Sequence, residues 1–186
     1  MELLKYIIYI NTFVWFLVPI RQYQTRFFIF FLILGLFDPI FIASNFLFKI
    51  NISIMYLLGT SILLYTALFN LIMRTRLILS VFFFVLSLLF FYFSAEKSIL
   101  LQLIMHLLIF FNFFKMFVLS YSESRKVSIF LLILLSYEFS LMLKFFMYLT
   151  QFQIGMIYFH LTSAFQILMG LFFIFVNEKN SPAIKV

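Results

Sequence analysis

The stretch FFIFFLILGLFDPIFIASNFLF, residues 27–48, decides the fold of this chain. It is apolar over the roughly 17–25 residues that a helix needs to cross the hydrocarbon core of a bilayer. An acid and a proline, Asp38 and Pro39, stand at its middle. A charge at that depth is costly, and such residues usually face the interior of a bundle and mark functional sites. The stretch therefore predicts a membrane-spanning helix that carries a buried acid.

The composition of the whole chain agrees with this interpretation. Of its 186 residues, 66% are hydrophobic and 10% are charged, whereas soluble domains are about 45–50% apolar and about 25% charged. The chain also has no cysteine, which excludes disulfides, thiolate metal sites and a cysteine nucleophile. These features predict an integral membrane protein without a separate soluble domain.

Short polar segments divide the apolar sequence into seven predicted spans. They are Leu3–Ile20, Phe27–Phe48, Ile52–Met73, Leu77–Ser94, Ser98–Ser120, Val127–Thr150 and Ile154–Val176. Lipid offers no partner to unpaired backbone groups, so each span must be a helix. We expect an all-α bundle of seven transmembrane helices in one domain, residues 1–176, followed by a short tail, residues 177–186.

The basic residues predict the orientation of this bundle. Eight Lys and Arg lie in alternate loops and in the tail: Arg21, Arg26, Arg74, Arg76, Arg125, Lys126, Lys179 and Lys185. The opposite side holds Lys5, Lys49 and Lys97. Cytoplasmic loops are enriched in Lys and Arg, so we expect the N-terminus outside and the C-terminus in the cytoplasm. The membrane would be a bacterial or an organellar inner membrane.

Residues 27–48 also resemble residues 127–148. Several apolar positions match, and Asp38 falls on Glu138. With a shift of four residues, Asn70 falls on Gln166. This pattern predicts two parallel three-helix repeats, residues 1–76 and 98–176, joined by the fourth span, an arrangement that occurs in carriers. Chance is the alternative, because chains so rich in Phe, Leu and Ile align with themselves readily.

The candidate binding residues are the polar groups inside the spans. Among the ionisable ones, Lys115 is close enough to the cytoplasmic end of its span to extend its ammonium to the interface. The other ionisable groups lie in the outer half or near the centre, at about 9–18 Å from the outer end for a rise of about 1.5 Å per residue. Asp38 with Lys144 and His106 with Glu138 are the cross-helix pairs that depth allows. We predict a ligand site among Asp38, His106, Glu138, Lys144 and His160, with Asn70 and Gln166 added from the repeat.

Two further residues of the first stretch shape the expected bundle. Pro39 lacks an N–H and removes a bond to the carbonyl of Gly35, which favours a bend. Gly35 has no side chain, so another helix can approach it closely.

The motifs of common enzymes and metal sites are absent from the sequence, and we expect no cofactor and no metal. The prediction is a small carrier or membrane sensor that binds a small solute or ion. The alternative is a non-catalytic subunit of a larger membrane complex, with membrane-protein partners or copies of itself. Nucleic acid is not an expected partner, because the basic residues lie in short loops between apolar runs.

Overall fold

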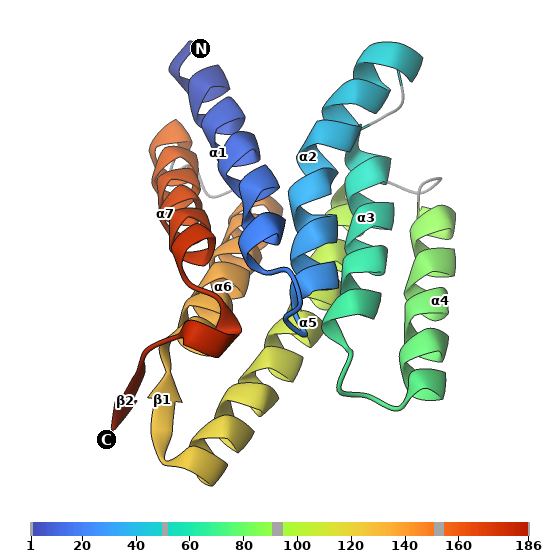
Figure 1. Ribbon diagram of the computed structural model, residues 1–186. Coiled ribbons are helices and arrows are strands. Elements are labelled where there is room, and N and C mark those ends of the chain that lie inside the picture. The colour runs from blue at the N-terminus through green and yellow to red at the C-terminus, as the bar shows by residue number, and fades with distance from the viewer. Residues whose placement is uncertain (1, 50–51, 91–94, 151–154, 186) are drawn as a thin grey trace.

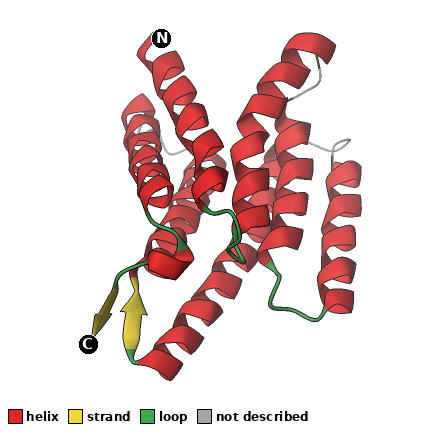
Figure 2. Ribbon diagram, in the orientation of Figure 1, coloured by secondary structure: helices red, strands yellow, loops and turns green. Residues whose placement is uncertain are grey.

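The computed structural model describes residues 2–49, 52–90, 95–150 and 155–185. Within these ranges the chain is all-α, with seven helices and one small pair of strands (Figures 1 and 2). The helices are α1 (Glu2–Arg21), α2 (Phe28–Phe48), α3 (Ile52–Ala67), α4 (Met73–Phe90), α5 (Ala95–Ser124), α6 (Ile129–Leu149) and α7 (Gly155–Phe175). Each predicted span overlaps one of these helices, so the all-α prediction is confirmed. Val127 and Ser128, predicted to begin the sixth span, belong to a strand instead, and the predicted span ends Ser94 and Ile154 lie outside the described residues.

Three of the helices are long and apolar enough to cross a membrane by length and composition. They are α2, the part of α5 from Lys97 to Ser124, and α6. Shorter apolar helical segments cover Tyr6–Arg21, Met55–Ala67 and His160–Phe175 among the described residues. The chain therefore has the helices of a membrane protein.

The end of α3 corrects one predicted boundary. We expected a span to Met73, but α3 ends at Ala67 and a turn leads to α4. Two side chains from other parts of the chain bind the carbonyls at this helix end. Asn112 donates to the Ala67 carbonyl over 2.8 Å, and Arg76 donates to the Tyr65 carbonyl over 2.5 Å. These bonds satisfy carbonyls that a helix end leaves unpaired.

Six helices pack in a closed ring. Along the ring α1 contacts α2, α2 contacts α3, α3 contacts α5, α5 contacts α6, α6 contacts α7, and α7 returns to α1. Helix α4 packs outside this ring, on α3 and α5 (Figure 1). The buried faces of the six ring helices therefore meet in one interior.

Close helix contacts in the ring depend on glycine. A Cβ on Gly35 would lie 2.5 Å from the backbone oxygen of Trp15, so α1 and α2 touch there with nothing between them. The close approach predicted for Gly35 is confirmed. Gly170 does the same for α7, where a Cβ would lie 2.6 Å from the Val14 side chain of α1.

Below this contact the interior is filled with aromatic rings. Six phenylalanines have 0–1% exposure and pack against one another in tilted and edge-to-face pairs. They are Phe27, Phe30, Phe31, Phe113, Phe130 and Phe173. Such ring geometries add to the stabilisation from apolar burial, so this half of the bundle is a packed aromatic core.

The tail is folded rather than free, which the sequence did not indicate. After α7 a short 3-10 helix, η1 (Glu178–Asn180), leads to the strand β2 (Ala183–Lys185). This strand pairs antiparallel with β1 (Lys126–Ser128), directly before α6. The Ser181 hydroxyl and the Pro182 carbonyl accept bonds from the backbone N–H groups of Phe130 and Ile129. The tail thereby satisfies the open N–H groups of the first turn of α6.

The loop between α1 and α2 also binds the end of the bundle at which the tail lies. The Gln22 side-chain amide donates to the carbonyls of Phe173 and Val176 over 2.8 and 2.9 Å. Arg26 forms an ion pair with Glu178 of η1. The ends of α1, α6 and α7 are thus joined through the loop after α1 and the tail.

Candidate functional site

The interior of the ring brings together a cluster of polar side chains. We call it the polar cluster, and it consists of Asp38, Tyr56, His106, Tyr137, Glu138, Lys144 and Gln166. They come from α2, α3, α5, α6 and α7. Five of them were predicted from sequence, while Tyr56 and Tyr137 were not.

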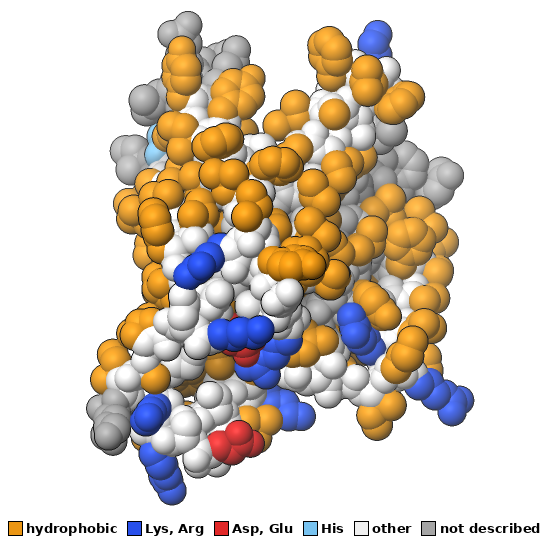
Figure 3. Space-filling model, in the orientation of Figure 1, with side chains coloured by type: hydrophobic (Ala, Val, Ile, Leu, Met, Phe, Trp, Pro, Cys, Tyr) orange, Lys and Arg blue, Asp and Glu red, His pale blue; other side chains and the backbone are white. Residues whose placement is uncertain are grey.

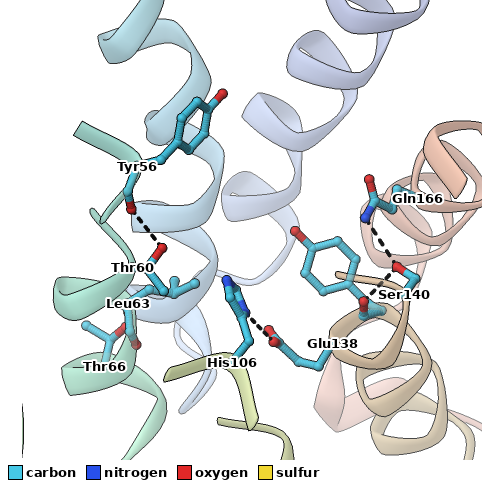
Figure 4. Close-up of polar contacts among 9 residues, drawn as sticks. Tyr56, Thr60, Leu63, Thr66, His106, Glu138, Ser140 and Gln166 are labelled. Carbon is cyan, nitrogen blue, oxygen red and sulfur yellow. Dashed lines mark hydrogen bonds and ion pairs between the residues drawn. The ribbon is translucent and has the colours of Figure 1, made fainter. Parts of the chain in front are cut away.

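His106 and Glu138 form the most buried part of the cluster. The Nδ1 atom of His106 lies 2.8 Å from Oε2 of Glu138, and the side chains are 4% and 0% exposed. Figure 4 shows the two side chains pointing toward one another from α5 and α6. The His106 ring also stacks on Phe145, with centroids 5.3 Å apart. The pairing that depth suggested for these two residues is therefore present in the structure.

Asp38 is held by the two helices that flank α2. The Tyr56 hydroxyl of α3 donates to one carboxylate oxygen over 2.7 Å, and the Thr12 hydroxyl of α1 lies 3.4 Å from the other. Asp38 is half-buried and Tyr56 is 38% exposed. The carboxylate thus faces α1 and α3 rather than the outside of the bundle, and part of it is open.

A hollow lies at one end of the molecule. The Thr12–Asp38 bond joins α1 and α2 about one turn beyond the Gly35 contact, and from there the two helices diverge (Figure 1). Figure 3 shows the resulting hollow at the end of the molecule that holds the N-terminus. The surface around the hollow is mostly apolar in this view. We call this end the open end, and the end that holds the tail the closed end.

Lys144 is bound to polar side chains of α7. Its ammonium donates to the Ser163 hydroxyl over 3.2 Å and to the Gln166 side-chain carbonyl over 2.6 Å. The Gln166 amide donates in turn to the Ser140 hydroxyl over 3.2 Å (Figure 4). For the predicted pair of Asp38 with Lys144, the bonds described above go to other residues, those of Asp38 to Thr12 and Tyr56 and those of Lys144 to Ser163 and Gln166.

Tyr137 directly precedes Glu138 in α6 and is 5% exposed. Its ring lies 4.4 Å from the ring of Trp15, the only tryptophan in the chain. No sequence pattern singled out this tyrosine, because a tyrosine inside a span is usually a packing or interface residue.

The other two predicted site residues lie apart from the cluster. Asn70 is exposed in the turn after α3, so the span that was predicted to contain it ends too early to place it inside. His160 lies in α7, half-buried, and its Nδ1 atom is buried without a hydrogen-bond partner among the described residues. Asn70 and Gln166, aligned by the repeat, therefore do not lie in equivalent surroundings.

A groove runs along the outside of the bundle between α6 and α7. It has a volume of about 610 Å³ and is lined mainly by apolar side chains, among them Phe139, Leu161 and Phe165. Ser140 lines its inner wall and connects it to the polar cluster through Gln166. Apolar pockets with a few polar groups are the usual form of small-molecule and partner sites.

No group of three or more metal-ligating side chains occurs among the described residues. No protein-family model, curated protein or solved structure matches this chain.

Proposed function

We propose that this chain is a multi-pass membrane protein that crosses the bilayer seven times, with the open end outside and the closed end in the cytoplasm. The exposed surface of the helices is apolar, as lipid requires, and most Lys and Arg in Figure 3 gather toward the closed end. Cytoplasmic ends carry this excess of positive charge. The three helices that are long and apolar enough to span a membrane support the same proposal.

The two-repeat arrangement is part of this proposal. Exchanging α1, α2 and α3 with α5, α6 and α7 maps each contact of the ring onto another contact of the ring. The α1–α7 contact, for example, corresponds to the α5–α3 contact. Parallel repeats related by an axis along the membrane normal have this property.

We further propose that the protein binds a small solute or ion in the outer half of the bundle, as a small carrier or membrane sensor. The observation that carries this proposal is the polar cluster itself. Groups of both charge signs, Asp38 and Lys144, lie inside an apolar bundle, and Figure 3 shows a hollow at the open end of this bundle. Ionisable side chains in such positions mark substrate and ion pathways in membrane proteins.

A thermal-shift screen tests the binding proposal. The purified protein in mild detergent is heated with monovalent salts, amino acids, sugars and small organic acids, and unfolding is followed by the fluorescence of Trp15. A ligand that binds the folded state increases its stability by about 2.7 kcal/mol when its concentration is one hundred times its Kd. The midpoint temperature of unfolding then rises. We expect at least one solute class to stabilise the wild type and to have no effect on Asp38→Asn and Lys144→Met.

The screen contradicts the proposal if no solute class has an effect, or if both variants respond as the wild type does. Lys115→Met is the matched control for loss of a lysine, since Lys115 is exposed on α5 and is not part of the polar cluster. Its response should equal that of the wild type.

The groove between α6 and α7 favours a second candidate function, a non-catalytic subunit of a larger membrane assembly. Its apolar lining could accommodate the side chains of a partner helix, which would bury a continuous apolar face. Purification in mild detergent separates the two candidates. A subunit would elute with stoichiometric partner chains, whereas a carrier or sensor module would elute alone or as copies of itself.

A further inference from the structure

The groove between α6 and α7 follows from where the glycines of these helices lie. Gly170 of α7 faces α1, and α6 contains no glycine. Helix α7 therefore packs closely on α1, whereas α6 and α7 pack least closely of the neighbouring pairs in the ring. The groove of about 610 Å³ lies between them, and a smaller hollow of about 150 Å³ continues it along the same two helices. A volume of this size is typical of small-molecule sites.

Large side chains form the rim of the groove and small ones form its floor. Phe139, Leu161 and Phe165 line it and are 50%, 68% and 46% exposed, so they stand at its edges. Ser140 and Thr162 also line it and are almost completely buried. Membrane helices pack on one another where small residues let two backbones approach. Here the large rim keeps a partner helix away from the small floor, so an occupant that reaches the floor has to be thinner than a helix, as a hydrocarbon chain is.

The hydrogen bonds of the groove also favour hydrocarbon. The hydroxyls of Ser136, Ser140 and Thr162 each donate to a backbone carbonyl one turn earlier in their own helix, over 2.9, 2.7 and 2.9 Å. None of the residues described as lining the groove is charged. A polar solute would lose its water here without finding enough partners, which is unfavourable, whereas apolar cavities bind apolar molecules.

Tyr158 differs from these three residues and gives the occupant a direction. It lines the groove near the start of α7, and its hydroxyl has no hydrogen-bond partner among the described residues. The start of α7 lies at the open end (Figure 1). An occupant with one polar end therefore has that end at the open end of the groove and its apolar part farther along.

The depth of the groove agrees with the depth of lipid chains. Its main part runs along α7 from Tyr158 to Phe165, which is about 5 to 15 Å from the start of that helix at about 1.5 Å per residue. The hydrocarbon core of a bilayer is about 30 Å thick, so each leaflet contributes about 15 Å. In the membrane placement proposed above, the groove therefore opens sideways toward the lipid chains of the leaflet at the open end.

We propose that the groove between α6 and α7 binds one acyl chain of a membrane phospholipid, with the glycerol end of the lipid at the open end. This inference rests on the membrane placement proposed above and is independent of a solute site in the polar cluster. The chain covers Ser140, which accepts a bond from Gln166, and Gln166 in turn binds Lys144 (Figure 4). The bound lipid thus closes the wall of the bundle beside the polar cluster.

Quenching of tryptophan fluorescence by bromine on an acyl chain tests the inference in detergent micelles. Phe139→Trp and Phe165→Trp place a reporter on each wall of the groove, and the wild-type protein supplies the signal of Trp15 to be subtracted. Phe82→Trp, on the exposed face of α4, reports on ordinary lipid contact. Phosphatidylcholine brominated in the middle of its chains is added in small steps.

The groove reporters and the surface reporter should respond differently. We expect the fluorescence of both groove reporters to fall and to reach a plateau while the lipid is still a minor part of the micelle, because a site fills by mass action. Excess unbrominated phosphatidylcholine should restore it. The fluorescence of Phe82→Trp should fall in proportion to the lipid content, without an early plateau.

A pair of variants separates the groove from the surface beside it. Ser136 lies where the two parts of the groove meet, and Ser136→Phe should fill it and abolish the plateau of the Phe165→Trp reporter. Ala164→Phe is the control, because Ala164 is exposed on α7 and does not line the groove, and it should keep the plateau. Both should elute as a single species from size-exclusion chromatography. If Ser136→Phe aggregates, the smaller Ser136→Leu replaces it with the same expectation.

Three results would overturn the inference. The groove reporters could be quenched only in proportion to the lipid content, or Ser136→Phe could leave the plateau intact. A copurifying protein chain that shields both groove reporters from the lipid would assign the groove to a partner helix instead. If the brominated lipid quenches Phe82→Trp but not the groove reporters, the lipid site fails while the membrane placement stands, and if it quenches none of the three, both fail.

Discussion

At the scale of single residues, the His106–Glu138 pair shows how strongly a buried charge depends on its partner. Breaking a buried pair by removing one member costs about 3–5 kcal/mol, whereas replacing both members by apolar side chains of similar volume is often neutral or stabilising. Both side chains here are almost completely buried. The pair therefore stabilises the contact between α5 and α6 only while both members are present.

We predict that His106→Leu lowers the stability by about 3–5 kcal/mol, because Glu138 is left without its partner. His106→Leu combined with Glu138→Leu should recover most of that loss. Thermal or denaturant unfolding of the purified protein in detergent measures both effects. Losses that simply add in the double variant would show that the two side chains do not interact.

Gly35 gives a second prediction at this scale. Gly35→Ala places a Cβ 2.5 Å from the backbone oxygen of Trp15, and backbone cannot move aside as the end of a side chain can. We expect α1 and α2 to separate and the stability to fall by about 1–3 kcal/mol, the usual cost of overpacking. Ala43→Leu on the exposed face of the same helix is the control and should unfold at the wild-type temperature. Equal midpoints for both variants would contradict the close contact.

At the scale of elements, the sequence predicts the helices better than their ends. The length of each apolar run determines whether a helix forms, and all seven runs became helices. The end of α3 depends instead on Asn112 of α5 and Arg76 of α4, which reach its last carbonyls from other parts of the chain. A contact with a helix distant in sequence leaves no local signal, so the position of Asn70 could not be predicted.

The same limit applies to the polar cluster. Ionisable residues inside apolar runs are conspicuous, and five of the seven predicted site residues lie in the cluster. Tyr56 and Tyr137 were missed because tyrosine is common at span ends and in packed interiors. The role of Tyr56 follows from the position of Asp38 on the neighbouring helix α2, which only the packing reveals.

For α3 we predict that Asn112→Leu destabilises the protein by about 1–3 kcal/mol, since the carbonyl of Ala67 loses its buried donor. Hydrogen exchange should increase first in the last turn of α3. Phe114→Leu, an exposed substitution on the same helix, should leave exchange in α3 unchanged. Identical exchange in the Asn112 variant and the wild type would mean that this bond does not hold the end of α3.

At the scale of the whole molecule, the two ends of the bundle differ. Aromatic packing, the Gln22 bonds and the tail join the helices at the closed end, whereas α1 and α2 diverge at the open end. If the chain crosses a membrane as proposed, a bundle with one packed end and one hollow end presents its interior to one side of that membrane. In a carrier this would be one of the two access states.

The absence of cysteine makes the orientation directly testable. Lys49→Cys lies after α2 at the open end, and Ile72→Cys lies in the exposed turn between α3 and α4. In intact cells a membrane-impermeant maleimide should label the first variant and not the second. Both should react after the membrane is opened. Labelling of Ile72→Cys in intact cells would reverse the proposed orientation, and equal labelling of both would contradict an odd number of crossings between them.

The paired strands β1 and β2 also constrain the order of biosynthesis. The ribosome makes α6 before α7, and the residues that bind the first turn of α6 come later still. The bonds from the tail to β1 and to the first turn of α6 can therefore form only after the chain beyond α7 has emerged from the ribosome. Until then the backbone N–H groups of Ile129 and Phe130 must be hydrated or bound by another partner.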